Sequence, residues 1–157
     1  MNYTQPMRGV GGWLAFFVIA LCVLGPSQLI SSTVVGFSTL EASIPGASVL
    51  PAWQDYKLYT WIVIGLVIGL RLLAGGLLTN HFKPLSVRVA ISVLWVTPLI
   101  TSVGTLISAK AAFGAETPVS PVDTAYVFMA NIVIAAVWTS YLVKSVRVRN
   151  TYYGAQC

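Results

Sequence analysis

Four long apolar runs set the pattern of hydrophobic and polar positions along the chain. Each is close to the roughly 20 residues that an α-helix needs to cross the hydrocarbon core of a bilayer. The runs cover Trp13–Val35, Leu58–Thr79, Val89–Ala109 and Ala125–Val143. The pattern predicts an all-α, polytopic membrane protein: a single domain of residues 1–157 with four transmembrane helices, ending in a basic tail over residues 144–157.

The composition favours lipid rather than water around this domain. Of the 157 residues, 57% are hydrophobic and 8% are charged, and the mean hydropathy is +0.82. Soluble domains have about 25% charged residues. A water-soluble fold of this length would leave large apolar patches exposed. We therefore expect one membrane domain.

The charged connectors predict an orientation, because Lys and Arg are enriched on the cytoplasmic side of membrane proteins. Six cations lie in the first segment, the second connector and the tail: Arg8, Lys83, Arg88, Lys144, Arg147 and Arg149. All four acids lie in the first and third connectors: Glu41, Asp55, Glu116 and Asp123. This alternation predicts that both termini are cytoplasmic. The net charge of +5 is then a topology signal, and we expect no nucleic-acid partner.

Two sets of residues are expected at the membrane surfaces. Lys144, Arg147 and Arg149 directly follow the fourth run and would anchor it to anionic lipid headgroups, at about 1 kcal/mol per charge. Docking of a cytoplasmic partner is the alternative. Amphipathic rings near the predicted helix ends favour the headgroup region. They are Trp13, Trp53, Tyr56, Tyr59, Tyr126 and Tyr141.

The first run could be a cleaved signal peptide, since a basic segment ending at Arg8 precedes it. It exceeds the roughly 7–15 apolar residues of a signal peptide, so we expect a retained helix. Gly25-Pro26 in this run and Pro98 in the third predict bends, because proline removes a backbone donor and clashes with the preceding turn.

Arg71 is the one charged residue inside an apolar run, roughly 12 Å from the cytoplasmic end of its helix. A membrane-centred arginine costs about 2.5–3.5 kcal/mol and usually faces a bundle interior or water. Arg71 would then contact an anion or lipid headgroup, or act as a counter-ion in a transport path. Alternatively, its stem extends toward the cytoplasmic headgroups. No run holds an acidic residue to pair with it.

Glycines mark another face of the second run. Gly65, Gly69 and Gly76 let a second helix approach closely, and Arg71 points about 140° away from them. Both faces are therefore expected to contact protein. Packing within the bundle is the simpler interpretation of the glycine face, and a homo-oligomer is the alternative.

Polar side chains gather in the outer halves of the other runs. They are Ser27, Gln28, Ser31, Ser32, Thr97, Thr101, Thr105, Ser108 and Asn131. They line either an outward-facing cavity or ordinary helix contacts. With Arg71, we take Gln28, Asn131 and Thr101 as the candidate ligand or helix-contact residues, because the large amides are the hardest to explain by packing.

Catalytic and metal-binding patterns are lacking in the sequence. The runs hold no paired carboxylates, and we find no nucleophile and base set, phosphate loop or HExxH motif. Cys22 and Cys157 are separated, and His81 is the only histidine. We therefore expect no enzyme and no cofactor or metal.

Distinctive residues occur at both ends and in the second connector. They are Gly9-Val-Gly11-Gly12-Trp13-Leu14, Phe82-Lys83-Pro84 leading to Trp95, and Tyr141-Leu-Val-Lys144-Ser145-Val-Arg147-Val-Arg149-Asn150-Thr151-Tyr152. They resemble the bacterial family known as domain of unknown function 2569. The resemblance implies a small four-helix protein of the bacterial inner membrane and no activity. The second connector is less basic than in that family.

Two functional hypotheses follow. The first is a non-enzymatic accessory or assembly subunit of a membrane complex, whose partners are the lipid bilayer with its anionic headgroups and a membrane protein or a second copy. The alternative is a small transporter or permeation subunit with an outward-facing polar cavity. An intramembrane enzyme would need catalytic residues that the sequence does not offer.

Overall fold

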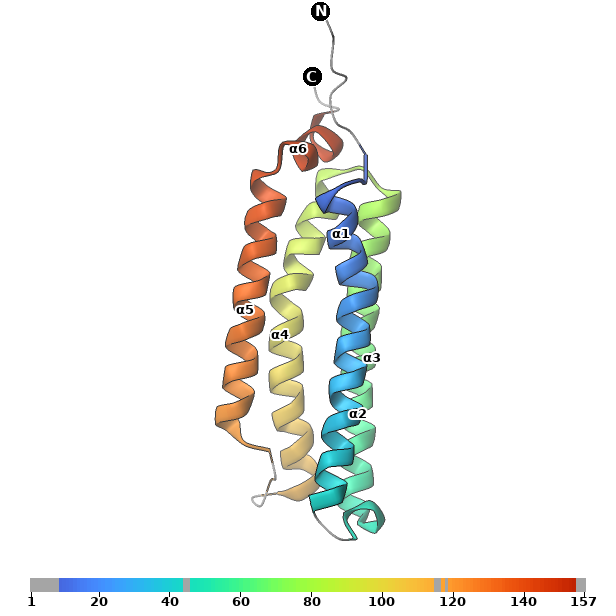
Figure 1. The fold of residues 1–157 in the computed structure, drawn as a ribbon, viewed down its shortest axis with the longest axis vertical. Coiled ribbons are helices and arrows are strands. Elements are labelled where there is room, and N and C mark those ends of the chain that lie inside the picture. The colour runs from blue at the N-terminus through green and yellow to red at the C-terminus, as the bar shows by residue number, and fades with distance from the viewer. Residues whose placement is uncertain (1–8, 44–45, 115–116, 118, 155–157) are drawn as a thin grey trace, which may run out of the picture.

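Four long helices make up the computed structural model of the protein, which describes residues 9–43, 46–114, 117 and 119–154. Arg8, Glu116 and Cys157 lie outside these ranges. In chain order the elements are α1 (Trp13–Ile19), the π-helical turn η1 (Ala20–Leu24), α2 (Gly25–Ser43), the 3₁₀ turn η2 (Ala47–Val49), α3 (Pro51–Asn80), α4 (Pro84–Phe113), α5 (Pro121–Lys144) and α6 (Val146–Tyr152). α1, η1 and α2 form one continuous span (Figure 1).

All four spans are long and apolar enough to cross a membrane, and no strand occurs in the described ranges. The prediction of an all-α polytopic membrane protein is confirmed. Each span extends beyond its apolar run. Pro51, Pro84 and Pro121 lie in the first turns of α3, α4 and α5, where a missing N–H leaves no hydrogen bond unmade. Hydropathy thus located the start of the first span and, to within one residue, the ends of the second and fourth, but it placed the other helix ends too far inside.

The described acidic residues gather at one end of the bundle, and most of the basic connector and tail residues lie at the other. Glu41, Asp55 and Asp123 lie at the end opposite the termini, where α2 ends and α3 and α5 begin. The basic connector after α3 and the basic residues around α6 lie at the end that carries the termini (Figure 1). We call these the far end and the termini end. Which end faces the cytoplasm stays a prediction from the charge pattern.

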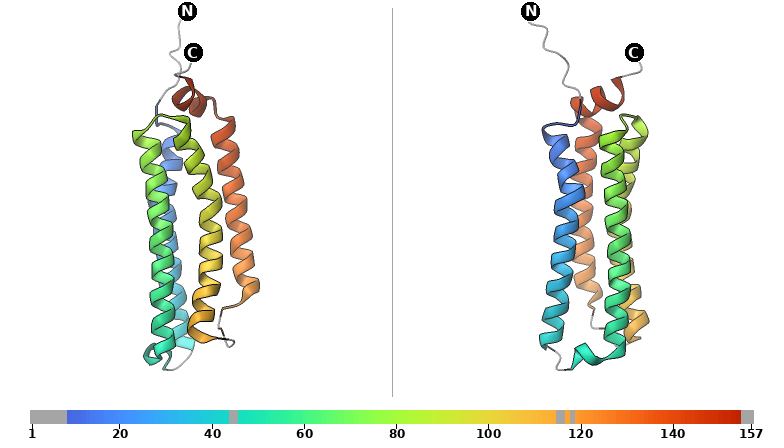
Figure 2. Two further views of the ribbon diagram at one scale, coloured as in Figure 1. Left: turned by 180° about the vertical axis from the view of Figure 1, so that it is seen from behind. Right: turned by 90° about the vertical axis from the view of Figure 1, so that its right-hand side faces the viewer.

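The helices pack around α3 and α4, which form the most extensive pair. α5 lies against α4, and the α1–η1–α2 span lies against α3 (Figures 1 and 2). The larger apolar cluster fills the termini half, with Leu14, Phe17, Leu21, Ala74, Leu78, Val87, Ala90, Val93, Leu142, Val148 and Tyr152. A smaller cluster closes the far end, with Phe37, Trp53, Tyr56 and Ala109.

The far end is held by an aromatic and ionic network. Trp53 Nε1 and Lys57 Nζ both donate to Glu41 Oε1, at 2.6 and 2.7 Å. Trp53 and Tyr56 are 3% and 6% exposed. Their position at a helix end agrees with the prediction, but the rings are buried between helices instead of turned toward headgroups. The network therefore joins α2 to α3.

The first span accommodates its proline by a change of helix type. Pro26 cannot donate to the carbonyl of Cys22, and the preceding turn widens into η1, in which Gly25 N–H bonds to the carbonyl of Ala20. Pro98 lies inside α4. The expected irregularity in the first span is therefore a π-helical turn.

The tail folds back over the termini end as α6. Val148 and Tyr152 are buried, and the Tyr152 hydroxyl donates to the carbonyl of Leu78 at 2.6 Å. Burial raises the pKa of Tyr152 to about 12. Gly9 N–H donates to Thr151 Oγ1 at 3.0 Å. The two ends of the chain are thus joined here.

Arg147, predicted as a surface anchor, has a contact that the sequence did not reveal. Its guanidinium lies against the N-terminal glycines: a Cβ added to Gly11 would come within 2.8 Å of Nη1, and one added to Gly12 within 3.0 Å. Lys144 and Arg149 are exposed, as an anchoring role requires. The glycine motif therefore provides space for a side chain from α6.

Candidate functional site

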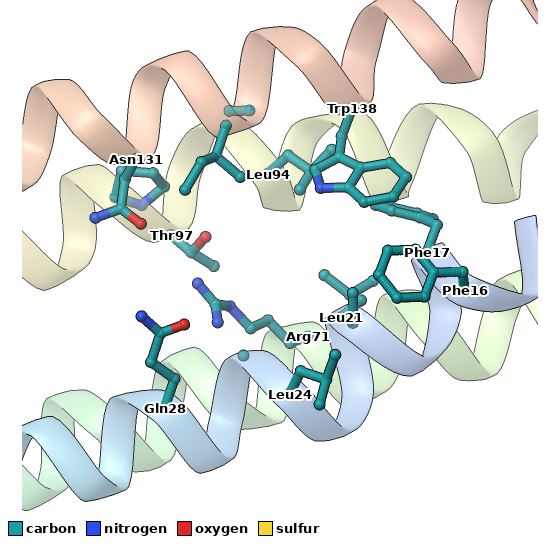
Figure 3. Close-up of a pocket in the computed structure, with 15 residues that line it drawn as sticks. Phe16, Phe17, Leu21, Leu24, Gln28, Arg71, Leu94, Thr97, Asn131 and Trp138 are labelled. Atoms are coloured by element: carbon teal, nitrogen blue, oxygen red, sulfur yellow. The ribbon is translucent and has the colours of Figure 1, made fainter. Parts of the chain in front are cut away.

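A cavity of about 330 Å³ lies in the middle of the bundle, between the two apolar clusters. All four spans contribute to its lining. Figure 3 shows that its side chains are sorted by character. Arg71, Gln28, Thr97 and Asn131 lie at one end, and the rings of Phe16, Phe17 and Trp138 lie at the other.

Arg71 extends into the polar end of this cavity. Side chains on a helix lean toward its N-terminus, and α3 begins at the far end. The guanidinium accordingly points toward Gln28 and Asn131 and away from the nearer termini end (Figure 3). The stem therefore does not extend toward the nearer headgroups. Over the described residues, the Arg71 side chain has no hydrogen bond or ion pair.

Gly25 makes the space that the guanidinium occupies. A Cβ added to Gly25 would collide with Arg71 Nη1. The Cys22 thiol of the adjoining π-helical turn lies 4.0 Å from the carbonyl oxygen of Arg71. The irregular part of the first span therefore faces Arg71. The sequence flagged Gly25-Pro26 as a bend, but nothing in the pattern linked it to Arg71.

The two large amides line the same cavity as Arg71, at the end toward which its guanidinium points. Asn131 Nδ2 donates to the carbonyl of Val127 at 2.8 Å, one turn earlier in α5. In Figure 3 the side-chain oxygens of Asn131 and Gln28 are turned toward the guanidinium. Thr97 is 2% exposed and also faces this end. The neighbours of Arg71 in this part of the structure are thus polar but uncharged.

Thr101 lies elsewhere. It lines a second cavity of about 220 Å³ between α4 and α5, together with Thr105 and Asp123. Thr101 Oγ1 donates to the carbonyl of Thr97 at 2.7 Å, and Thr105 Oγ1 donates to that of Thr101 at 2.8 Å. Ser27 likewise donates to its own helix, at the carbonyl of Val23. These hydroxyls are satisfied by backbone and are explained by helix structure.

The glycine face is open. A Cβ added to Gly65, Gly69 or Gly76 would meet no atom within 4 Å, so these glycines do not pack within the bundle as the simpler interpretation expected. The close approaches occur instead at Gly75 and Gly104, whose added Cβ atoms would collide with Cys22 Sγ and with Val63 Cγ1. Spacing alone did not reveal which glycines face inward.

The Arg71 cavity is open at the side of the bundle. Leu24 and Gln28 on the first span are exposed, and so is Ile134 on α5. These residues line the cavity and also belong to the outer surface. The cavity therefore opens between the first span and α5, onto the surface that faces lipid.

A family model described as a protein of unknown function (DUF2569) matches residues 7–153. No curated protein and no solved structure matches the chain.

Proposed function

Because the chain belongs to the DUF2569 family, whose function is unknown, we propose a role from its geometry: a non-enzymatic accessory or assembly subunit of a membrane complex. The carrying observation is Arg71, a guanidinium in a laterally open cavity with uncharged neighbours. We further propose that the partner presents an acidic side chain to Arg71 from its own transmembrane helix.

The depth of Arg71 favours such a partner. Its Cα lies nine residues from the end of α3 at Asn80, about 13 Å along the helix, and the side chain extends further inward. Phospholipid headgroups stay near the surface and do not reach this depth. A carboxylate on a neighbouring helix does reach it. Paired with the guanidinium, it would offset the cost of a charge within the membrane.

The open glycine face supplies a second surface for assembly. Gly65 and Gly69 are exposed on α3, and the neighbouring Ile62 and Leu66 are exposed as well. Small residues at this spacing allow close helix contact in lipid. This surface suits either a second copy of the chain or the same partner complex.

Photocrosslinking tests the role. A photoreactive residue replaces Ile134, which lines the cavity, or its neighbour Val133, which does not; both side chains are exposed. In native membranes we expect a discrete protein adduct from position 134 and much less from position 133. Arg71→Leu should abolish the adduct, and Arg71→Lys should retain part of it. Lipid adducts alone, with a monomer purified from nanodiscs, would reject the role.

The alternative, a small transporter or permeation subunit, rests on a different observation. Thr97 lines the Arg71 cavity and Thr101, one turn further along α4, lines the second cavity. The two cavities thus follow one seam toward the far end, where Asp123 lies. Four spans leave little room for the repeats that gate known transporters.

Vesicle swelling separates the two roles. Proteoliposomes are exposed to gradients of chloride, acetate or phosphate. A transporter predicts swelling above that of protein-free vesicles, reduced by Arg71→Leu and by Gln28→Leu. The transport role fails if the unmodified chain inserts normally and no anion produces swelling. It also fails if both variants insert normally and do not change the swelling. The assembly role is unaffected by that result.

A further inference from the structure

A third cavity, of about 290 Å³, lies at the termini end between α4, α5 and α6. Its walls are Val87 and Ile91 of α4 and Leu142 and Val143 of α5. Arg149 and Tyr153 complete the lining. We call this site the α4–α5 groove. It therefore combines an apolar wall with one cationic side chain, Arg149, and one phenol, Tyr153.

The register of α6 places the polar pair. Val148 and Tyr152, four residues apart, are buried against the bundle. Arg149 and Tyr153 follow each of them by one residue, so they also share a helix face and border the groove. Both side chains are exposed. Across the described ranges, no hydrogen bond or ion pair occupies the Arg149 side chain.

The depth of the groove matches a lipid lying along the protein. Val87 and Ile91 are three and seven residues into α4, about 5 and 10 Å below its end. Arg149 and Tyr153 follow the end of α5 at Lys144, at the level where headgroups begin. An acyl chain would therefore meet the apolar wall while its headgroup meets the polar pair.

The charge around the groove selects the headgroup. Arg88 and Lys144 adjoin groove residues in the sequence and are exposed. Within the described part of the chain, the acidic residues Glu41, Asp55 and Asp123 lie at the far end. An anionic headgroup would thus meet cations without an opposing carboxylate.

We propose that the α4–α5 groove binds an anionic glycerophospholipid. Its phosphate accepts hydrogen bonds from the Arg149 guanidinium and the Tyr153 hydroxyl, and one acyl chain lies on Ile91 and Val143. This site is separate from Arg71 and does not depend on the proposed assembly role.

Native mass spectrometry of the full chain in detergent tests the site, with phosphatidylglycerol and phosphatidylcholine as probes. Arg149→Gln should weaken the first phosphatidylglycerol binding step about fivefold, as expected for loss of about one charge contact. Val143→Trp, which fills the groove without changing charge, should weaken it at least as much. Lys83→Gln is the control, because it removes an exposed cation at the same end outside the groove lining.

The outcomes are decisive in both directions. Selective loss in Arg149→Gln and Val143→Trp, with Lys83→Gln within twofold of the original chain, supports the site. Equal loss of affinity in Arg149→Gln and Lys83→Gln would show that the lipid binds through general surface charge and not at the α4–α5 groove. Equal affinity for the two lipids would show that the groove does not select an anionic headgroup. Tyr153→Phe, which leaves the ring in place, provides a second test of the phosphate contact and should weaken phosphatidylglycerol binding.

Discussion

Single glycines control the contacts in the middle of this bundle. Gly25 admits the guanidinium of Arg71, and Gly75 admits the thiol of Cys22. In contrast, Gly65 faces open space on the same helix as Gly75. An added methyl group therefore has different consequences at each position, which yields matched tests.

Gly75→Ala should destabilise the bundle. The new methyl group would collide with Cys22 Sγ between the first span and α3, and overpacking of this kind costs about 1–3 kcal/mol. Thermal melting in detergent should show the loss, and Cys22→Ala in the same chain should restore part of it. Gly65→Ala should leave the melting temperature unchanged or raise it slightly, because alanine favours helix. Equal destabilisation at the two positions would contradict the packing.

Gly25→Ala should act on the cavity rather than on the fold. The clash is with the far end of a flexible side chain, so the guanidinium would move while the helices stay in place. We expect a melting temperature close to that of the original chain and a weaker crosslink from position 134. A large fall in the melting temperature would show that Gly25 is needed for helix packing instead.

Tyr152 should give the termini end a dependence on alkaline pH. Its pKa is raised to about 12 from an ordinary value of 10.0, so the folded state favours the neutral phenol. The stabilisation is complete below about pH 10 and is lost as the pH rises toward 12. Tyr152→Phe should lower stability at neutral pH by about 1 kcal/mol and should reduce the loss between pH 9 and pH 11. Identical pH profiles for the two chains would contradict this.

At the scale of elements, the first span and α6 carry most of the detail that the sequence did not reveal. The length of an apolar run identifies a membrane span, because the thickness of the bilayer sets how many residues a spanning helix needs. They do not show that Pro26 is accommodated by a π-helical turn, because that choice depends on the contact with α3. Nor do they show that a tail rich in Arg folds as α6, since Val148 and Tyr152 gain their burial from distant helices.

A pair of valines in α6 tests its docking. Val148 is fully buried against the bundle, whereas Val146 is 59% exposed. Val148→Asp should release α6 and make the tail accessible to protease while the four spans remain inserted, because an unpaired carboxylate is costly to bury. Val146→Asp should leave the tail protected. Protection in both variants would show that α6 is held by contacts other than this face.

For the whole molecule, the arrangement is a bundle with an apolar cluster toward each end and the Arg71 cavity between them. The number and order of spans were predictable, because they depend on composition and chain length. The sequence did not predict that Arg71, Gln28 and Asn131 line one cavity, because this depends on how three helices are rotated about their axes. The opposite assignment of Gly65 and Gly75 has the same cause.

The orientation of the molecule is tested by reporter fusions. The described acids lie at the far end together with Lys57 and Lys110, whereas the other connector and tail cations lie at the termini end, and this bias predicts that both termini are cytoplasmic. Alkaline phosphatase fused after Cys157 should therefore be inactive. The same reporter inserted in the segment between α2 and η2 should be active. The reverse pair of activities would overturn the orientation without affecting the four spans.

The joining of the two ends by α6 has a consequence for synthesis. Thr151 and Tyr152 are made after all four spans, yet they bind Gly9 and the last turn of α3, which are made much earlier. Until then the early segments have no α6 to cover them. Completion of the termini end therefore reports that all four spans have been translated. Nascent chains stopped before α6 would expose an unfinished surface to the cell's quality control.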